Sequence, residues 1–169
     1  LGVVYLPAKD ILYSAVCGGG SFVTKNRATA KRLLVSSKTD FSEMDLAVSR
    51  DHRSPKMSQI VKAMGFRSEV GRGSVGVKVG LIAEQTCDLY IHLSHRTKFW
   101  DTCGPQVIIE EAGGKLTDLF GTVIRYDIGN VQNLNGILAS NGAAHEFAVE
   151  ALKPILNEFG RVRLTCSAS

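Results

Sequence analysis

Short apolar runs separated by turn residues fill the first part of the chain. Runs rich in β-branched and aromatic residues alternate with Pro7–Asp10, with three consecutive glycines at 18–20 and with a basic polar stretch. This pattern is typical of antiparallel strands joined by tight connections. It predicts strands at residues 3–6, 11–16, 22–24 and 33–35.

From residue 45 onward, short apolar runs alternate with longer amphipathic stretches, which indicates α/β packing. The expected strands are 46–49, 67–70, 88–93, 115–118 and 136–140. The expected helices are 54–64, 75–85, 102–112 and 143–158. In the last helix, apolar residues recur at three- and four-residue spacing and Gly160 follows as a stop, while Pro154 predicts a kink or an early end.

These patterns divide the chain into three parts. Residues 1–44 are expected to form antiparallel strands of a first lobe, and residues 45–160 an α/β lobe. Residues 161–169 lack apolar periodicity and are expected to be a disordered tail. The predicted fold class is α/β (α+β overall), in which the remnant of an antiparallel sheet precedes an α/β sandwich lobe. Because Leu1 opens directly into an apolar run, we expect the chain to begin inside a larger unit.

Composition and charge restrict the class of protein and its partners. The 169 residues are 44% apolar and 21% charged, as in an ordinary globular domain, which excludes collagen-like and disordered proteins. The net charge is only +4 and the basic residues are scattered, so no polymeric nucleic acid is expected as a partner. A small anionic ligand needs only two or three convergent cations. No membrane-spanning run or leader is visible, and the expected location is cytoplasmic.

Several residue types that often carry chemistry have ordinary explanations here. The cysteines at 17, 87, 103 and 166 stand far apart without a C-x-x-C motif, so we expect free thiols in a reducing compartment. His92 and His95 are expected on opposite faces of a strand end, which makes a poor metal pair. Glu110 and Glu111 lie late in an amphipathic helix, where solvation is the expected state.

Asp101 is the first candidate for chemistry, because it follows the aromatic pair Phe99-Trp100 at the start of the helix expected over 102–112. On spacing alone the favoured interpretation is an N-cap that accepts hydrogen bonds from the amides of residues 102–104. The functional alternative is a carboxylate held at the edge of an α/β sheet, where it coordinates a hard cation.

Residues 100–118 make the sequence recognisable. The run Trp-Asp-Thr-Cys-Gly-Pro-Gln-x-Ile-Ile-x-Glu-Ala-Gly-Gly-Lys-Leu-Thr-Asp resembles the second signature of the lithium-sensitive, magnesium-dependent phosphomonoesterases of the inositol monophosphatase superfamily. Residues 137–142 resemble the strand before the last helix of that family, and residues 2–7 resemble its central strands. The resemblance covers about residues 1–158 and implies the carboxyl-terminal part of that fold, with Mg²⁺ as cofactor and Asp101 as metal ligand and catalytic residue.

Two features resemble the 3′(2′),5′-bisphosphate nucleotidase branch of this superfamily. Ser49-Arg50-Asp51-His52 is similar to the Ser-Arg-x-His of that branch, and Lys78 falls where the branch carries a phosphate-binding lysine. The resemblance implies hydrolysis of adenosine 3′,5′-bisphosphate to AMP and phosphate, with Ser49, Arg50, His52 and Lys78 binding the substrate. Without the resemblance, the favoured interpretation of Lys78 is a solvated helix lysine. The commoner role of a single imidazole such as His52 is a core or surface histidine with one local hydrogen bond.

The family's other metal ligands come mainly from an upstream glutamate and an Asp-Pro-x-Asp-Gly-Thr segment, and neither occurs in this sequence. A single carboxylate rarely holds Mg²⁺, so we expect the isolated chain to bind the ion very weakly and to be inactive. We also expect a homodimer or a first lobe supplied elsewhere. The alternative functions are an inositol or sugar phosphate phosphatase of the same superfamily, or a non-catalytic nucleotide-binding module.

Overall fold

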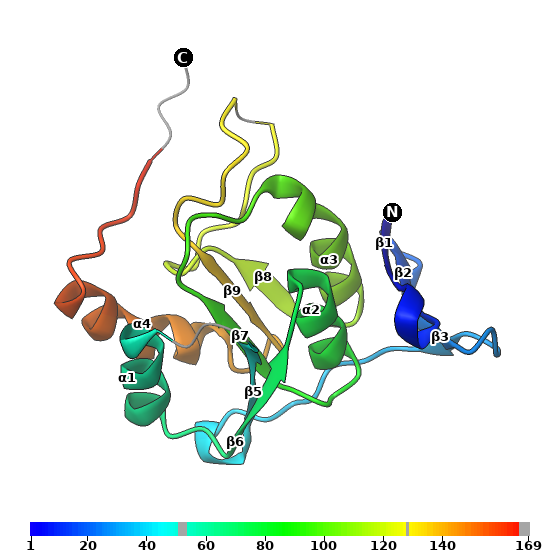
Figure 1. The fold of residues 1–169 in the computed structure, drawn as a ribbon, viewed down its shortest axis with the longest axis horizontal. Helices are drawn as coiled ribbons and strands as arrows, with labels where there is room; N and C mark the ends of the chain where they lie inside the picture. Colours follow the sequence, from blue (N-terminus) through cyan, green and yellow to red (C-terminus); the bar gives the residue numbers. More distant parts are fainter. Residues whose placement is uncertain (51–53, 128, 166–169) are drawn as a thin grey trace.

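The computed structural model describes residues 1–50, 54–127 and 129–165 (Figure 1). Its first sheet is antiparallel throughout, as the alternating pattern near the amino terminus predicts. The strands lie in chain order: β1 (Gly2–Leu6), β2 (Ile11–Val16), β3 (Gly20–Lys25) and β4 (Lys31–Arg32). Strands β1 and β2 begin and end within one residue of the predicted bounds.

The strand predicted at 33–35 is wrong. The Leu33 amide donates to the Ser21 carbonyl at 2.8 Å, and the Val35 amide donates to the Ala112 carbonyl at 2.9 Å. Leu33 is buried against the core shared by the first sheet and the neighbouring helix. The run is apolar because it packs below the end of a helix, not because it pairs as a strand.

The second sheet contains all five strands predicted after residue 45, with ends displaced by two residues or fewer. Its strands are ordered β6-β5-β7-β9-β8, and β5 pairs in parallel with both β6 and β7. Strand β9 is antiparallel to β7 and β8. The bounds are β5 (Asp45–Ser49), β6 (Ser68–Arg72), β7 (Leu89–His92), β8 (Lys115–Thr117) and β9 (Ile137–Ser140).

The described residues form the four expected α-helices: α1 (Pro55–Met64), α2 (Val75–Ala83), α3 (Phe99–Glu111) and α4 (His145–Glu158). Helix α3 begins three residues before its predicted start. Helix α4 continues past Pro154, so the early end is wrong. Pro154 lies on the solvent side, while Leu152 and Ile155 pack into the core. None of the described helices has the length and apolarity to cross a membrane.

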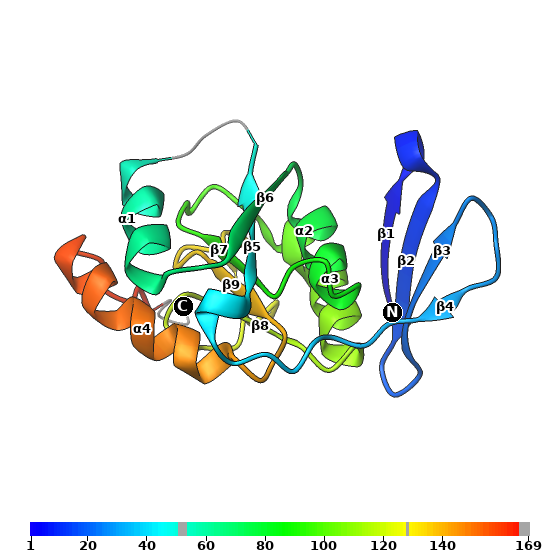
Figure 2. The ribbon, with the colours of Figure 1, turned by 90° about the horizontal axis from the view of Figure 1, so that it is seen from below.

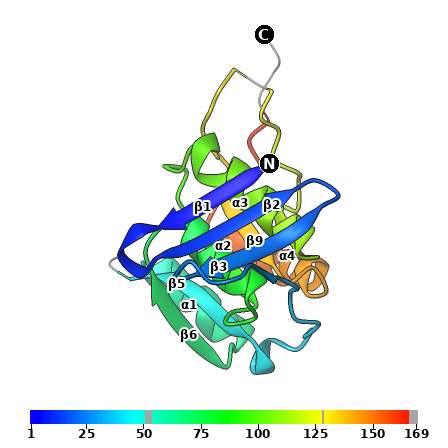
Figure 3. The same cartoon turned by 90° about the vertical axis from the view of Figure 1, so that its right-hand side faces the viewer.

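The elements stack in four layers (Figure 2). Helices α1 and α4 cover one face of the second sheet through a core that includes Leu46, Leu89 and Leu152. Helices α2 and α3 cover its other face, and the first sheet lies on the far side of these two helices. Figure 3 shows β1, β2 and β3 crossing in front of α2 and α3. The α/β class with two sheets is therefore confirmed.

Two glycines allow the first sheet to approach α2 and α3 closely. A Cβ on Gly80 of α2 would lie 2.6 Å from the ring of Tyr13 on β2. A Cβ on Gly2 of β1 would overlap the carbonyl oxygen of Gly104 in α3. A side chain at position 2 would press on the backbone of α3, and one at position 80 would press on the Tyr13 ring.

We expect Gly80→Ala to destabilise the protein. Alanine is better than glycine in a helix interior by about 1 kcal/mol, but overpacking against the Tyr13 ring costs about 1–3 kcal/mol. The urea midpoint should therefore fall. Gly129→Ala is the matched control, because a Cβ there meets nothing within 4 Å. A midpoint for Gly80→Ala at or above that of the unmodified chain would contradict the close packing of these layers.

Two carboxylates tie connecting segments to the layers. Asp88 is fully buried and accepts hydrogen bonds from Ser36 Oγ, from Lys38 Nζ at 3.0 Å and from the Asp45 amide at 2.9 Å. Glu111 accepts bonds from the amides in the 18–20 turn at 2.7 and 2.9 Å. The prediction that Glu111 is merely solvated is therefore wrong, because this carboxylate holds the β2–β3 hairpin on the end of α3.

Candidate functional site

The carboxyl ends of the parallel strands β5, β6 and β7 meet at one edge of the second sheet, where α2 and α3 also begin. Ligands of open α/β sheets bind at this edge. A cavity of about 540 Å³ opens there. Six polar residues contribute to its lining: Ser49, Arg50, Ser54, Glu69, His92 and Ser94. Two of the predicted substrate-binding residues, Ser49 and Arg50, thus share one cavity.

Arg50 extends across the end of β6 toward the start of α2. A Cβ on Gly71 would lie 3.5 Å from Arg50 Cγ, and a Cβ on Gly73 would lie 3.5 Å from Arg50 Nη2. The two glycines therefore leave room for the guanidinium beside the helix terminus. A guanidinium and a helix N-terminus both attract anions, and Arg matches the geometry of phosphate oxygens.

Ser74, the residue before α2, has a strained backbone. Its φ is +50° and its ψ is 142°, a conformation that costs a side-chain-bearing residue about 1–3 kcal/mol. Strain of this kind concentrates at ligand sites, because the surrounding structure must impose it. Here it orients the first turn of α2 at the sheet edge that carries the cavity.

Lys78 is buried rather than solvated, so the interpretation as an exposed helix lysine is wrong. The residue is 3% exposed, its Nζ lies 3.3 Å from the Arg72 carbonyl, and the same atom is 4.8 Å from the centre of the Tyr90 ring. Burial lowers the pKa of the Lys78 amine to about 8, so most of it carries a charge at pH 7. Its contact to a substrate phosphate stays a prediction.

His92 ends β7 and lines the cavity, with its ring 6.0 Å from the ring of Tyr90. Burial, aided by the charge of Lys78, lowers the pKa of His92 to about 4. The imidazole is therefore neutral at pH 7 and offers one donor and one acceptor. From the sequence, His92 is expected only to form a poor metal pair with His95. Its position as the last residue of β7, the strand next to β5, is the signal that could have identified His92 as a residue of the cavity.

Asp101 lies inside the first turn of α3 and is not its N-cap. Its Oδ2 accepts a hydrogen bond from the Lys98 amide at 2.8 Å, and its own amide donates to the Lys98 carbonyl at 2.9 Å. The predicted bonds from the amides of residues 102–104 are therefore wrong. The charge of Asp101 contributes to raising the pKa of the Tyr90 hydroxyl, and it opposes the lowering of the His92 pKa. Asp101 is thus electrostatically coupled to the groups behind the cavity.

The donor chemistry of Asp101 fits one position of a magnesium site. Its carboxylate is partly exposed, and among the described residues its Oδ1 makes no hydrogen bond. Carboxylate oxygens are ligands that Mg²⁺ prefers. Within residues 1–50, 54–127 and 129–165, no three His, Cys, Asp or Glu side chains gather as a metal group. In the described part of the chain, Asp101 therefore does not belong to a cluster of three or more such ligands.

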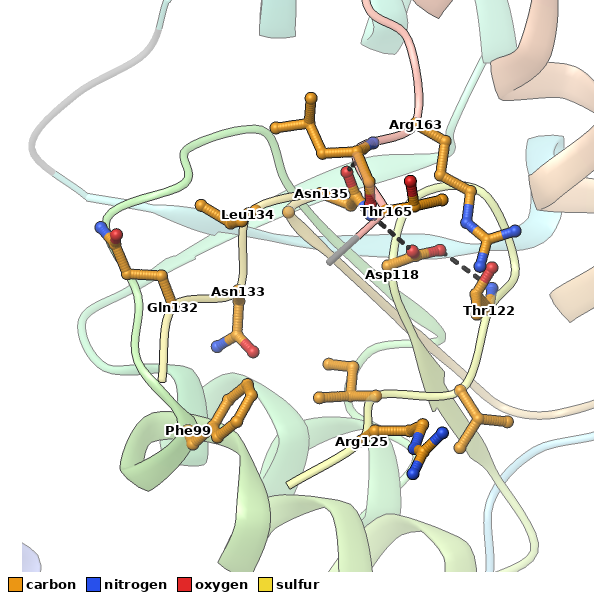
Figure 4. A pocket seen from close by; sticks show the side chains of 14 residues that line it. Phe99, Asp118, Thr122, Arg125, Gln132, Asn133, Leu134, Asn135, Arg163 and Thr165 are labelled. Carbon is orange, nitrogen blue, oxygen red and sulfur yellow. Dashed lines mark hydrogen bonds between the residues drawn. The ribbon is translucent and has the colours of Figure 1, made fainter. Parts of the chain in front are cut away.

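The remaining predicted features are His52, the cysteines and the carboxyl-terminal segment. His52 and Cys166 fall outside the described residues, while Cys17, Cys87 and Cys103 are free thiols. Residues 161–165 of the expected tail run past the beginning of β9, where the side chain of Asn135 exchanges two hydrogen bonds with the backbone of Leu164, both at 2.9 Å (Figure 4). This segment borders a second cavity of about 280 Å³ beside Phe99.

A sheet edge with a cavity of mixed polar and apolar lining, an arginine and two helix N-termini defines an α/β protein suited to a small anionic ligand. Residues 1–157 match the model of the inositol monophosphatase family, and the chain belongs to this family. The resemblance seen in the sequence is therefore confirmed.

Curated relatives with different names support this membership. The 3′(2′),5′-bisphosphate nucleotidase 1 of Dictyostelium discoideum is 32% identical over 120 residues, which are 70% of this chain and 38% of the relative. Inositol monophosphatase 3 of Xenopus tropicalis is 30% identical over 159 residues, which are 90% of this chain and 41% of the relative. The chain spans less than half the length of both proteins.

The fold is shared with solved structures. The Thermotoga maritima IMPase superimposes with a TM-score of 0.76 at 22% identity, over 94% of this chain and 57% of the other. Two sheets and four helices in the described residues therefore correspond to a part of that larger fold.

Proposed function

We propose that this chain is the carboxyl-terminal part of a magnesium-dependent phosphomonoesterase that hydrolyses a nucleoside 3′,5′-bisphosphate, such as adenosine 3′,5′-bisphosphate, to the monophosphate and inorganic phosphate. The observation that carries this proposal is the sheet edge at which Ser49 and Arg50 line a cavity and the Arg50 guanidinium lies beside Gly73, just before α2. Asp101 lies in the first turn of α3, which begins at the same edge. The names of the nucleotidase relatives support the substrate class.

Each side chain at this edge has a part in binding. Arg50 and the amides at the start of α2 bind a phosphate group, and Ser49 adds a hydroxyl. The neutral His92 imidazole accepts a hydrogen bond from a sugar hydroxyl or donates one to a ring nitrogen. Lys78 adds positive charge from behind Tyr90. Asp101 would hold a magnesium ion, and such an ion polarises the scissile phosphate and activates water when bound.

We infer that the isolated chain is inactive, because its described residues form no cluster of three or more His, Cys, Asp or Glu side chains that could complete a metal site around Asp101. The other ligands would come from the part of the relatives that this chain does not span. The same observation favours the second candidate, a module that binds a nucleotide without hydrolysing it. The Xenopus relative supports a third candidate, a phosphatase of inositol or sugar phosphates. A cytoplasmic location and a homodimer stay predictions.

Ligand binding by the chain itself tests the proposed substrate class. We expect calorimetry to rank adenosine 3′,5′-bisphosphate above AMP and above inositol 1-phosphate. Arg50→Ala should weaken bisphosphate binding roughly 10- to 100-fold, because a hydrogen bond to a charged group is worth about 1.5–3 kcal/mol. Arg27→Ala is the matched control, since Arg27 lies on the distant β3–β4 connection. Equal affinity for inositol 1-phosphate would instead favour the inositol phosphate alternative.

A further inference from the structure

The segment that leads into β9 is paired with the segment that leads into α3. The Phe99 amide donates to the Val131 carbonyl at 2.8 Å, and the Asn133 amide donates to the Thr97 carbonyl at 3.0 Å. Residues 131–133 therefore support the start of α3 from one side, although about 30 positions separate the two segments in the sequence.

The side chain of Asn133 adds to this pairing. It is 4% exposed and lies near Phe99, at the first turn of α3 (Figure 4). Its Nδ2 donates to the Lys98 carbonyl at 3.0 Å and lies 3.3 and 3.4 Å from the hydroxyls of Thr97 and Thr102. All three acceptors belong to the turn in which α3 begins, so one amide group holds both sides of that turn.

The backbone of Lys98 connects Asn133 to Asp101. The carbonyl of Lys98 receives both the Asn133 side chain and the Asp101 amide. The amide of Lys98 donates to Asp101 Oδ2 at 2.8 Å. The carbonyl and the amide of Lys98 belong to consecutive peptide units that meet at its Cα, so a displacement of the carbonyl is passed through this Cα to the amide that bonds Asp101. Asn133 is the side chain that fixes this carbonyl.

We propose that Asn133 is a positioning residue, which holds the Asp101 carboxylate in place for metal binding through the backbone of Lys98. This inference rests on the proposed function, because that function assigns the metal ion to Asp101. Asn133 itself does not touch the ion. Groups that orient a metal ligand matter nearly as much as the ligand, and losing one typically costs 10- to 100-fold in metal affinity.

An unpaired oxygen allows the positioning role to be separated from a merely structural one. Asn133 Oδ1 is buried and has no hydrogen-bond partner in the described part of the chain. A buried acceptor without a donor destabilises the fold. Asn133→Leu keeps the same branched arrangement of side-chain heavy atoms, with a larger volume, and removes this oxygen together with the Nδ2 donor. The loss of the unpaired acceptor and the loss of the donor have opposite effects on stability. The expected result is weaker metal binding at a nearly unchanged melting temperature.

Terbium luminescence measures this binding on the chain itself, because the triple charge of Tb³⁺ attracts a carboxylate more strongly than Mg²⁺ does. Tb³⁺ is a hard cation that prefers oxygen ligands, and the chain's single tryptophan, Trp100, stands next to Asp101 and sensitises only an ion bound nearby. We expect Asn133→Leu to need roughly 10 to 100 times more Tb³⁺ for half-saturation. Asn135→Leu is the matched control, because Asn135 bonds Asp118 and Leu164 instead of the α3 turn. Amide hydrogen exchange at residues 99–102 should accelerate only in the Asn133 variant.

Binding by Asn133→Leu that equals the unmodified chain, or that Asn135→Leu weakens to the same degree, would overturn the inference. If Asp101→Asn keeps the full terbium signal, the ion does not bind Asp101 and the proposed function fails separately. In that case, amide hydrogen exchange at residues 99–102 tests the inference. Faster exchange in Asn133→Leu supports the positioning of the turn by Asn133, and unchanged exchange overturns the inference. If Asn133→Leu does not fold, Asn133→Ala is measured against the same outcomes.

Discussion

Asp101→Asn is expected to leave the fold intact and to remove most magnesium-dependent phosphate release from a complete enzyme. The asparagine oxygen can still accept the Lys98 amide, so the first turn of α3 keeps its hydrogen bond. The neutral amide, however, does not match the charge of the ion. Metal stabilisation of the transition state is worth several kcal/mol, so we expect a loss on the order of 100-fold or more in kcat.

The measurement uses a chimera in which this chain follows the amino-terminal part of the Dictyostelium nucleotidase. Phosphate release from adenosine 3′,5′-bisphosphate is followed against magnesium concentration. Asp127→Asn serves as the control, because Asp127 pairs with Arg125 on the surface. A second arm uses the 169-residue chain alone. If that chain hydrolyses the bisphosphate and Asp101→Asn abolishes the reaction, our inference of an incomplete metal site is wrong.

Acid is expected to destabilise the fold well above the pH at which carboxylates titrate, because His145 is buried in a neutral form. Its Nε2 lies 2.9 Å from Thr117 Oγ1 and its Nδ1 lies 2.8 Å from Ser140 Oγ. Thr117 donates its own proton to the Asp118 carbonyl, so Nε2 carries the imidazole hydrogen and Nδ1 accepts from Ser140. Burial, aided by the charge of Lys115, lowers the pKa of His145 to about 4.

The sign of the pH effect follows from this pKa. Between pH 6.5 and pH 4 the unfolded chain binds a proton that the folded chain excludes, so stability falls as the pH falls. For His145 the loss between pH 7 and pH 5 is about 2 kcal/mol. His92 contributes with the same sign. Urea titrations at pH 7, 6 and 5 measure the loss, and His145→Gln should make it smaller. An equal pH dependence in both proteins would refute the assignment.

Local patterns predicted most elements of this fold, and long-range contacts explain the exceptions. The 3.6-residue spacing of apolar side chains is a property of α4 itself, so it could be recognised directly. The start of α3 could not, because Phe99 and Trp100 look like the end of a strand. The helix begins there since Lys98 and Asp101 bond each other and Asn133, far along the chain, bonds the same turn.

The candidate site was predictable to the extent that a contiguous motif marks it. Ser49 and Arg50 stand together in one motif, and both line the cavity. The burial of Lys78 follows from two sheets enclosing α2, and the residues of α2 alone do not reveal the second layer. His92 comes from a different strand, which only the β5–β7 pairing brings alongside Ser49.

The contacts at Gly2 and Gly80 show that a residue can be kept among relatives for packing, and not only for binding a ligand. At position 2 the backbone of α3 excludes a side chain, and at position 80 the Tyr13 ring excludes one, whatever molecule the protein binds or transforms. A relative with the same layer spacing would need glycine at position 2, and at position 80 if it also keeps the aromatic ring, even if it has lost all catalysis. Invariance at these two sites would therefore report on architecture, and only residues such as Arg50, which no packing demand fixes, would carry information about the ligand.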